Sequence, residues 1–565
     1  MKRALLLAAA LAALAPAPGF AQPQPPTAAS APVADFEAQA RALLEANYSA
    51  DEPGAAVLVA RGDRVLFRAA RGLADMDRRT PLSPDHLFRI GSVTKQFAAA
   101  GLLKLVEHGK VRLDDPLTKY LPGYPGGERI TVEMLLNHTS GVKSYTEIDG
   151  YMTDAVRHDR TTAEMIAVFR DLPADFEPGT RWNYNNSGYV LVGAVIEAAS
   201  GMPWHQWLEQ SLFRPLGMRD TGYGHDPRWA ARQVRGFSSL DGKTVTDPLP
   251  MSMTQPHAAG ALLSTVDDLL KWNRALHEGR VLSDATYRRM ITPVGPAADP
   301  AIGYGFGIYA GTVRNRPALR HNGGIFGFAS SLYYLPGPDI TVVVLENDDV
   351  SNPRDSADTL VRKLAAMALG DPYPAPTPIP VDPAALTAAE GLYRFDGGVV
   401  RILRVVDGKL TAQRGNGPRT PLIPIATDEF LYDNGFDRIR LERDAGGRIT
   451  GARFFARGEG DGLVGVRADE ALPSTPIGLQ LPLAVLERLA GVYVRDGLTL
   501  TVSLEGDALK AQLAGQEAFR LRASSPTRFH VDESGATLDF PTGDAQAAEV
   551  TIRQGAREVV LRRKP

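Results

Sequence analysis

The chain has 565 residues, more than one hydrophobic core usually serves, so we expect several domains. Its hydrophobic content of 44% and charged content of 22% are those of a soluble globular protein, and its formal net charge of −3, without a dense run of Lys or Arg, gives no reason to expect a nucleic-acid partner. The absence of cysteine excludes disulfide bonds and cysteine metal ligands, so the folded state must be stabilised by packing.

The first residues have the pattern of an export signal. The basic pair Lys2-Arg3 precedes an apolar run over residues 4–14, and residues 19–21 (Gly-Phe-Ala) provide the small residues of a cleavage site. We expect a signal peptide at residues 1–21 and a periplasmic or secreted mature protein. The apolar run is too short for a transmembrane anchor, and a lipid anchor would need a cysteine.

Residues 22–370 mix strand and helix patterns and are expected to form one large domain. A hairpin is predicted over residues 55–72, and helical patterns dominate from Ser92 to about residue 276. Strand patterns return in "YGFGIYAG", "SSLYYLPG" and "ITVVVLEND". Strands at both ends with helices between them predict an α+β fold, in which helices flank an antiparallel sheet and form a helical subdomain.

A candidate nucleophile lies in "GSVTKQFAAAGLLKLVEHGK", at the start of a helical pattern that Ser92 is expected to open. Ser92 and Lys95 are three residues apart, so on a helix the amine can reach the hydroxyl. Serine becomes nucleophilic when a base takes its proton, and lysine serves as that base only if burial or a neighbouring cation lowers its pKa. The helix is apolar nearly all round and should be buried, where a lysine is costly unless it has a role.

A second Ser-x-x-Lys pair, Ser140 and Lys143, competes with the first. A motif this short is expected about once by chance in a chain of this size. The second pair lies in the polar turn "NHTSGVKSY", where the two side chains do not share a helical face. The comparison of the two pairs therefore favours Ser92, rather than Ser140, as the nucleophile.

Two further stretches place reactive groups in turns. Tyr184 and Asn186 precede an apolar helix; tyrosine can relay a proton if cations lower its pKa, and asparagine can hold a substrate carbonyl or a catalytic lysine. His321 begins the Gly-rich "HNGG", where missing side chains let a substrate backbone lie close. Either stretch alone is more often structural than functional.

Two Pro-rich segments, residues 371–386 and 471–483, predict linkers. They set off two tails, residues 387–470 and 484–565, whose short alternating runs and turn residues predict small antiparallel β-barrels. The tails repeat each other with an offset of 100 residues, so that Tyr393 matches Tyr493. A period this long indicates duplicated domains.

The ordered set Ser-x-x-Lys, Tyr-x-Asn and His-x-Gly resembles the active-site motifs of the serine β-lactamase and penicillin-binding-protein superfamily, especially its class C-like branch. The stretches "LLNHTSGV" and "AAGALLSTVDDLLKW" are similar to structural signatures of that branch, and Ser140 falls inside the first. The resemblance covers about residues 36–370. It implies a β-lactamase-like domain, here followed by two lipocalin-like barrels.

The resemblance also implies acyl transfer. Ser92 would attack a carbonyl, with Lys95 and Tyr184 as base, and water would resolve the acyl-enzyme. The backbone N–H groups of Ser92 and Gly324 would hold the oxyanion, and Asn186 would position Lys95 and the substrate. The implied catalytic residues are Ser92, Lys95, Tyr184 and His321, and the implied substrate-binding residues are Asn186, Gly323 and Gly324.

One departure bears on the substrate. β-Lactamases and DD-carboxypeptidases usually begin the third motif with a lysine, whereas His321 is largely neutral near pH 7 unless perturbed. A histidine there is similar to D-aminopeptidases and to esterases of the superfamily. D-aminopeptidases also carry two barrels after the catalytic domain and remove an N-terminal D-residue with a free amine. In that family a loop of the last barrel reaches the active site. The candidate turns here are Asp532-Glu533 and Gly543-Asp544.

The favoured expectation is an exported D-aminopeptidase acting on short peptides or amides. Three alternatives stay open: an esterase or acyl transferase on the same site, a β-lactamase or DD-carboxypeptidase, and a non-catalytic cell-envelope binding protein. We expect no cofactor and no metal, since the histidines form no H-x-x-x-H or H-E-x-x-H pair. A homodimer also stays open, since the sequence does not determine the oligomeric state.

Overall fold

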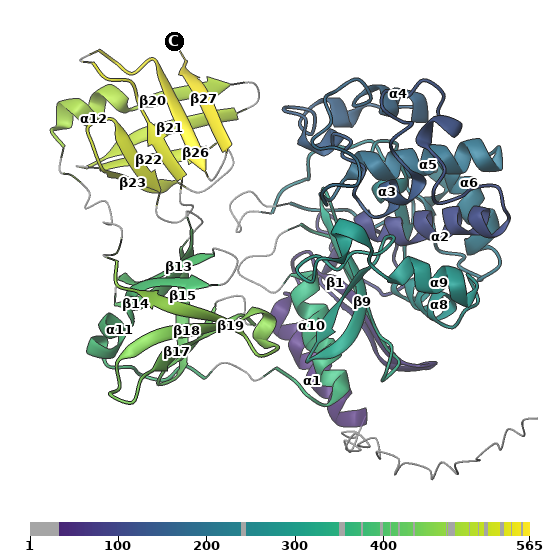
Figure 1. Cartoon of the computed structure of the whole chain (residues 1–565), viewed down its shortest axis with the longest axis horizontal. Coiled ribbons are helices and arrows are strands. Elements are labelled where there is room, and N and C mark those ends of the chain that lie inside the picture. The colour runs from purple at the N-terminus through teal and green to yellow at the C-terminus, as the bar shows by residue number, and fades with distance from the viewer. Residues whose placement is uncertain are drawn as a thin grey trace, which may run out of the picture.

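The computed structural model contains a large domain of sheet and helices and two small β-barrels (Figure 1). The predicted signal peptide, residues 1–21, lies outside the described residues, and so does most of the second predicted linker. Among the helices that the structure describes, none is long and apolar enough to cross a bilayer. The described residues are 33–238, 245–349, 356–373, 377–395, 399–406, 408–415, 419–432, 436–470, 472, 479, 481–495, 498–506, 508–513, 518–531, 536–543, 545–554 and 557–564.

The large domain is built on one antiparallel sheet of six strands in the order β2-β1-β11-β10-β9-β8. The predicted N-terminal hairpin pairs with the last strand of the domain, with Val57 opposite Val344. Segments from both ends of the domain therefore lie side by side, as the sequence predicts for an α+β fold. The strands are β1 (Ala55–Arg61), β2 (Arg64–Arg71), β8 (Tyr309–Val313), β9 (Arg316–Ile325), β10 (Phe328–Leu335) and β11 (Ile340–Glu346).

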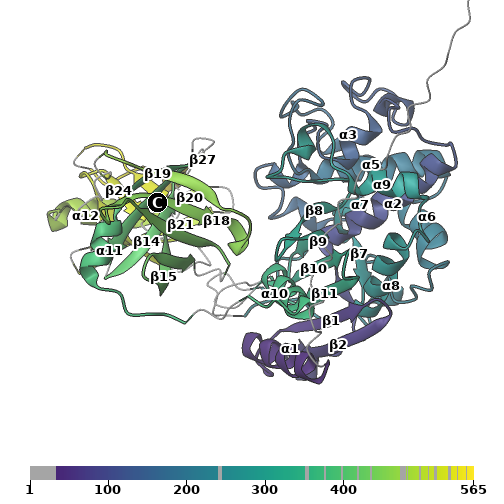
Figure 2. The ribbon, with the colours of Figure 1, turned by 60° about the horizontal axis from the view of Figure 1, so that its bottom comes forward.

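Both faces of this sheet are covered by helices. Because side chains alternate along a strand, Val57 and Val59 of β1 pack into one core while Leu58 packs into the other. The first core lies under α1 (Val33–Asn47) and α10 (Ala357–Leu369), and the second lies under α8 (Val266–His277) and the helical subdomain. Figure 2 shows α10 and α8 on opposite sides of the sheet.

The helical subdomain packs around α2 (Thr94–Glu107) and α5 (Asn186–Ser200). The predicted burial of α2 is confirmed, since eleven of its 14 residues are buried. The other helices are α3 (Val132–Leu136), α4 (Thr162–Ala167), α6 (Trp204–Leu208), α7 (His257–Gly260) and α9 (Asp284–Ile291). Short strands complete the domain: β3 (Leu73–Asp75) with β4 (Thr80–Pro81), and β5 (Phe88–Arg89) with β7 (Leu262–Ser264) and β6 (Gly222–Tyr223).

The two tails form closed barrels of eight antiparallel strands, which confirms the fold predicted from their alternating patterns. Barrel 1 consists of β12 (Gly391–Phe395), β13 (Val400–Val406), β14 (Lys409–Arg414), β15 (Arg419–Ala426), β16 (Glu429–Tyr432), β17 (Arg438–Arg443), β18 (Ile449–Phe455) and β19 (Leu463–Ala468). Barrel 2 consists of β20 (Gly491–Arg495), β21 (Leu498–Glu505), β22 (Ala508–Leu513), β23 (Phe519–Ala523), β24 (Arg528–Val531), β25 (Ala536–Asp539), β26 (Glu549–Gln554) and β27 (Arg557–Arg563).

Tyr393 and Tyr493, the tyrosines repeated between the tails, make the same hydrogen bond in each barrel. A short helix precedes each barrel, α11 (Pro383–Ala389) and α12 (Leu483–Leu489), and each begins inside a segment predicted as a linker. The buried Tyr393 hydroxyl donates to the carbonyl of Ala389 (2.8 Å), and the Tyr493 hydroxyl donates to that of Leu489 (2.6 Å). Each tyrosine satisfies a carbonyl at a helix end that has no partner within the helix.

Barrel 1 contacts the large domain through Glu459, which follows β18. Its carboxylate forms an ion pair with Arg362 of α10 (3.1 Å) and accepts hydrogen bonds from the Thr312 hydroxyl (2.6 Å), the Arg314 backbone N–H (2.7 Å) and the Tyr373 hydroxyl (2.7 Å). The Glu459 and Arg362 side chains are only 6% and 2% exposed, so this is a buried ionic contact between domains. Figure 1 shows barrel 1 beside α10.

Candidate active site

Ser92 lies in a tight 3₁₀ turn, η1 (Gly91–Val93), directly before α2. The sequence predicted that Ser92 opens the α-helix itself; instead the first turn is wound more tightly, as is common at helix starts, and α2 begins at Thr94. Gly91 has a φ of 47°, and a Cβ atom there would lie 3.0 Å from the backbone nitrogen of Gly324. Glycine at this position therefore lets Ser92 sit against the end of β9.

Lys95 is fully buried and points at Ser92. Its Nζ lies 3.0 Å from Ser92 Oγ, 2.9 Å from Asn186 Oδ1 and 2.9 Å from the carbonyl oxygen of Ala259. No carboxylate of the described residues forms an ion pair with it. Burial lowers the pKa of Lys95 well below its ordinary value. A neutral amine can accept a proton, so Lys95 is suited to act as a base for Ser92.

Tyr184 shares this environment but has the opposite pKa shift. Its ring centroid lies 4.7 Å from Lys95 Nζ. Burial raises the pKa of Tyr184 well above its usual value, more than the Ser92 hydroxyl lowers it. The expectation that a cation lowers the tyrosine pKa is not met, because burial is the largest contribution and raises it. Tyr184 is therefore protonated, and its hydroxyl can donate a proton.

Asn186 connects Lys95 to the neighbouring loop. Its Oδ1 accepts from Lys95, and its Nδ2 donates to the Thr146 hydroxyl (3.2 Å). It is the first residue of α5, whose N-terminus is capped by the Asn185 side chain. The predicted polar turn before an apolar helix is thus present, and it fixes the Asn186 amide against the lysine.

His321 lies beneath the pocket rather than on its surface. The side chain is buried, with Nε2 3.0 Å from the Tyr304 hydroxyl and Nδ1 2.6 Å from the carbonyl oxygen of Asn322. Burial, with a smaller contribution from the charge of Lys95, lowers the pKa of His321 to about 3. The histidine is therefore neutral at ordinary pH, and it supports an aromatic cluster instead of presenting a cation.

This aromatic cluster was not identified from the sequence. The ring centroid of His138 lies 4.5 Å from that of Tyr184, 4.6 Å from that of Tyr304 and 5.2 Å from that of Tyr189, in tilted contacts. The backbone N–H of Asn185 donates to His138 Nδ1 (3.1 Å), which ties the cluster to the turn that carries Tyr184. The "LLNHTSGV" stretch that contains His138 was the only sequence signal for this support.

Gly323 and Gly324 bring β9 against the nucleophile. A Cβ atom on Gly323 would lie 2.2 Å from the carbonyl oxygen of Ile90 and 2.9 Å from the backbone nitrogen of Ser92, so only glycine fits. A Cβ atom on Gly324 would meet nothing within 4 Å, because this residue faces the pocket. The end of β9 and Ser92 thus line one cavity.

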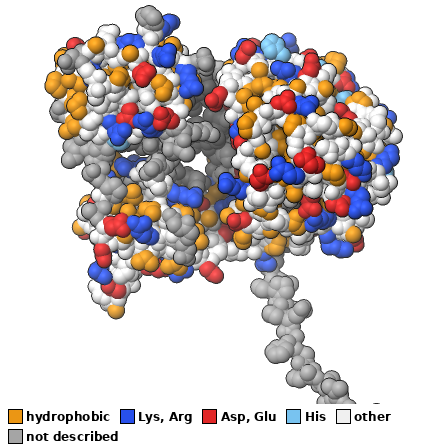
Figure 3. All heavy atoms as spheres, turned by 45° about the horizontal axis from the view of Figure 1, so that its top comes forward, with side chains coloured by type: hydrophobic (Ala, Val, Ile, Leu, Met, Phe, Trp, Pro, Cys, Tyr) orange, Lys and Arg blue, Asp and Glu red, His pale blue; other side chains and the backbone are white. Residues whose placement is uncertain are grey.

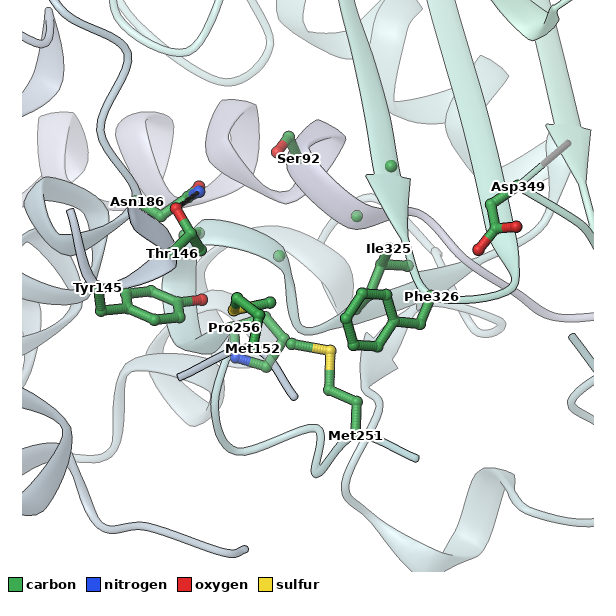
Figure 4. Close-up of a pocket in the computed structure, with 14 residues that line it drawn as sticks. Ser92, Tyr145, Thr146, Met152, Asn186, Met251, Pro256, Ile325, Phe326 and Asp349 are labelled. Atoms are coloured by element: carbon green, nitrogen blue, oxygen red, sulfur yellow. Dashed lines mark hydrogen bonds between the residues drawn. The ribbon is translucent and has the colours of Figure 1, made fainter. Parts of the chain in front are cut away.

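The cavity beside Ser92 has a volume of about 300 Å³ (Figure 4). Ser92 and Asn186 lie at its upper edge in the figure, and Ile325, Phe326 and Asp349 form the side opposite Asn186. Most of the lining is apolar, and all of it belongs to the large domain. The lining residues are Gly91, Ser92, Tyr145, Thr146, Met152, Asn186, Met251, Pro256, Ala259, Gly260, Gly324, Ile325, Phe326 and Asp349.

The competing pair Ser140 and Lys143 does not form a comparable site. Ser140 is buried, and its hydroxyl accepts from the Val142 backbone N–H (3.5 Å). Lys143 Nζ instead pairs with Asp175 (3.1 Å) and Glu147 (3.3 Å). The hydrogen bond to Asp175 raises the pKa of Lys143, so this amine stays protonated and cannot act as a base.

The described part of the chain offers no group of side chains that could hold a metal ion. On the face shown in Figure 3, acidic and basic side chains are interspersed rather than gathered into one basic patch. In the candidate turns of barrel 2, Asp532, Glu533 and Asp544 lie outside the described residues.

Comparison with known proteins connects this geometry to one family. The profile of the family described as Beta-lactamase matches residues 34–367, which leaves both barrels outside the match. Penicillin-binding protein 4* from Bacillus subtilis (strain 168) is 25% identical over 396 residues, or 66% of this chain and 87% of that protein.

Two proteins named for D-amino acids are also similar. D-aminopeptidase from Gluconobacter oxydans (strain 621H) is 29% identical over 344 residues, which cover 59% of this chain and 63% of that protein. The crystal structure of D-amino acid amidase from Ochrobactrum anthropi SV3, complexed with D-phenylalanine, superposes with a TM-score of 0.55 at 26% identity. It covers 60% of this chain and 99% of that one.

Proposed function

The chain belongs to the beta-lactamase family, and from that premise we propose that it uses Ser92 as the nucleophile of a D-aminopeptidase or D-amino acid amidase. One observation carries the catalytic part of this proposal. Lys95 Nζ is buried 3.0 Å from Ser92 Oγ, with no carboxylate partner in the described part of the chain, and burial lowers its pKa. A lysine held in this way costs stability and is most simply explained by its use as a base.

The reaction would proceed in two halves. Ser92 Oγ attacks the substrate carbonyl carbon while Lys95 takes the serine proton, and the backbone N–H groups of Ser92 and Gly324 receive the developing oxyanion. Protonated Tyr184 gives its proton to the leaving amine, and the proton on Lys95 restores Tyr184. Water then attacks the ester of Ser92 while Lys95 accepts a proton from it. Lys95 returns this proton to Ser92 Oγ as the acid is released, which regenerates the enzyme.

Three features support a D-amino acid substrate over a β-lactam or a peptidoglycan C-terminus. The third motif presents neutral His321, so it offers no cation to a substrate carboxylate. The pocket is mostly apolar and has no basic side chain among its lining residues to pair with a substrate carboxylate. Similar proteins include a D-aminopeptidase and a D-amino acid amidase.

A substrate panel on one preparation tests the activity. D-Alanine p-nitroanilide should be cleaved fastest, its N-acetylated form at least about tenfold more slowly, and nitrocefin hardly at all. A short-chain nitrophenyl ester should also turn over, since the same acyl-enzyme forms from a better leaving group. Release of nitroaniline or nitrophenol is followed by absorbance. Equal rates for the free and acetylated anilides would rule out the aminopeptidase, and a rate for the ester alone would favour an esterase.

The pH dependence tests the assignment of the base. Only the neutral Lys95 amine can accept the Ser92 proton, so kcat/KM should rise as the pH increases through the lowered pKa of Lys95. His321, with a pKa of about 3, should contribute no inflection near neutral pH. The measurement is a pH–rate profile with nitrophenyl acetate, which has no amine of its own. If the rise of kcat/KM with pH disappeared in His321→Gln, Lys95 would not be the base.

We also propose that the protein is exported after removal of residues 1–21 and that residues 387–470 and 484–565 act as accessory barrel domains. The basic pair and apolar run at the N-terminus support export. The intact mass of protein recovered from a periplasmic or culture fraction would test cleavage after Ala21.

A further inference from the structure

We propose that Asp349 binds an ammonium group of the substrate. This inference deepens the proposed function and rests on the pocket beside Ser92 being the substrate site. Asp349 follows β11, and its carboxylate lines the cavity on the side formed by Ile325 and Phe326 (Figure 4).

Asp349 is the acidic residue in an otherwise neutral lining. The other described lining side chains are apolar, hydroxyl or amide groups, or are absent in glycine. The Tyr145 hydroxyl is kept protonated, because burial raises its pKa. An isolated carboxylate in a largely apolar cavity attracts a cation and repels a substrate carboxylate, so it selects substrates by charge.

The Asp349 carboxylate is held in place from one side only. The Ser238 hydroxyl (2.7 Å) and the Gly327 backbone N–H (2.8 Å) both donate to Oδ2. Among the described residues no donor reaches Oδ1. One oxygen therefore anchors the side chain, and the other keeps its acceptor capacity for a ligand.

No positive group among the described residues neutralises Asp349. It takes part in no ion pair with these residues, and none of the other residues that line the cavity is basic. Lys95 is engaged by Ser92, Asn186 and Ala259, and His321 is neutral. An ammonium group from the substrate would provide the missing counter-ion.

The ammonium can come from two sources. It can be the α-amine of the residue that acylates Ser92, or an amine on a longer side chain that reaches past Phe326. Both present N–H donors to a carboxylate, and a charge-assisted hydrogen bond in a partly apolar site should change affinity about ten- to a hundredfold.

Competition experiments separate these sources. Ser92-dependent hydrolysis of nitrophenyl acetate serves as the reporter, and the inhibitors are hexanamide, D-norleucinamide and D-lysinamide, which differ in turn by an α-amine and a side-chain amine. We expect at least one amine to tighten inhibition about tenfold or more, and Asp349→Asn to bring that ratio of inhibition constants close to one. Asp149→Asn is the charge control, because Asp149 is exposed and does not line the cavity.

Three outcomes would overturn the inference: equal inhibition by all three amides in the parent protein, an unchanged ratio in Asp349→Asn, or an equal change in Asp149→Asn. Thermal unfolding midpoints of both variants confirm that each is folded. The proposed function fails differently, through the absence of D-amino acid amide hydrolysis, while the inhibition constants can still be measured on the ester reaction.

Discussion

Replacing Ser92 with alanine should lower kcat/KM for every substrate by at least about a thousandfold without unfolding the protein. The change removes the only atom proposed to bond covalently with the substrate. Ser92 is partly exposed in a short turn, so the smaller side chain should leave packing almost unchanged. Steady-state rates with an anilide and an ester measure the loss, and a thermal unfolding midpoint checks the fold.

The second Ser-x-x-Lys pair supplies matched controls. Lys95→Met should abolish turnover, whereas Lys143→Met and Ser140→Ala should keep most of it, because the Lys143 amine is protonated and paired with Asp175. Intact-mass analysis after exposure to a D-alanine ester should find one acyl adduct, which peptide mapping assigns to Ser92. An adduct on Ser140, or full activity in Ser92→Ala, would show that the nucleophile is wrongly assigned.

Local patterns were sufficient to predict most of the architecture. Alternation of apolar residues marked the strands of both barrels, and the all-round apolar character of residues 94–107 marked a buried helix. The spacing of Ser92 and Lys95 predicted their contact, because three residues correspond to nearly one helical turn. The offset between Tyr393 and Tyr493 predicted the duplication, since both tyrosines occupy the same place beside a preceding helix.

These local patterns could not predict which distant segments contact one another. Asp349, Met251 and Tyr145 carry no local signal of a pocket, and they meet only because β11 and two loops converge beside β9. The raised pKa of Tyr184 likewise depends on burial among the rings of His138, Tyr304 and His321, which come from three separate segments. The contact of Glu459 with α10 pairs residues 97 positions apart, and nothing in the sequence distinguishes this glutamate from others in the barrel.

Replacing Glu459 with alanine should destabilise the contact between barrel 1 and the large domain more than other single changes in the barrel. It leaves the Arg362 guanidinium, 2% exposed, as an uncompensated buried charge, which typically costs about 3–5 kcal/mol. It also removes the acceptor for Thr312 and Arg314 at the β8–β9 hairpin. The expected results are a thermal midpoint lowered by about 5 °C or more and faster hydrogen exchange in residues 309–325.

Two further variants show whether the stability lost in Glu459→Ala comes from the burial of the Arg362 charge or only from the loss of an ion pair. Glu470→Ala breaks an ion pair with Arg394 on the same barrel, but those side chains are 58% and 53% exposed, so its cost should be below about 1 kcal/mol. Changing both Glu459 and Arg362 to methionine should recover much of the loss, because no charge is then buried alone.

Burial alone would raise the pKa of Glu459, but hydrogen bonds from Thr312 and Tyr373 hold it below its usual value. The stabilisation from Glu459 is therefore fully present above about pH 4.3 and should be lost as the pH falls through the lowered pKa. Equal losses in Glu459→Ala and Glu470→Ala would mean that barrel 1 is attached by the linker and not by this buried contact. In that case the β8–β9 hairpin, and with it the Gly323 and Gly324 end of β9, would be positioned by the large domain alone.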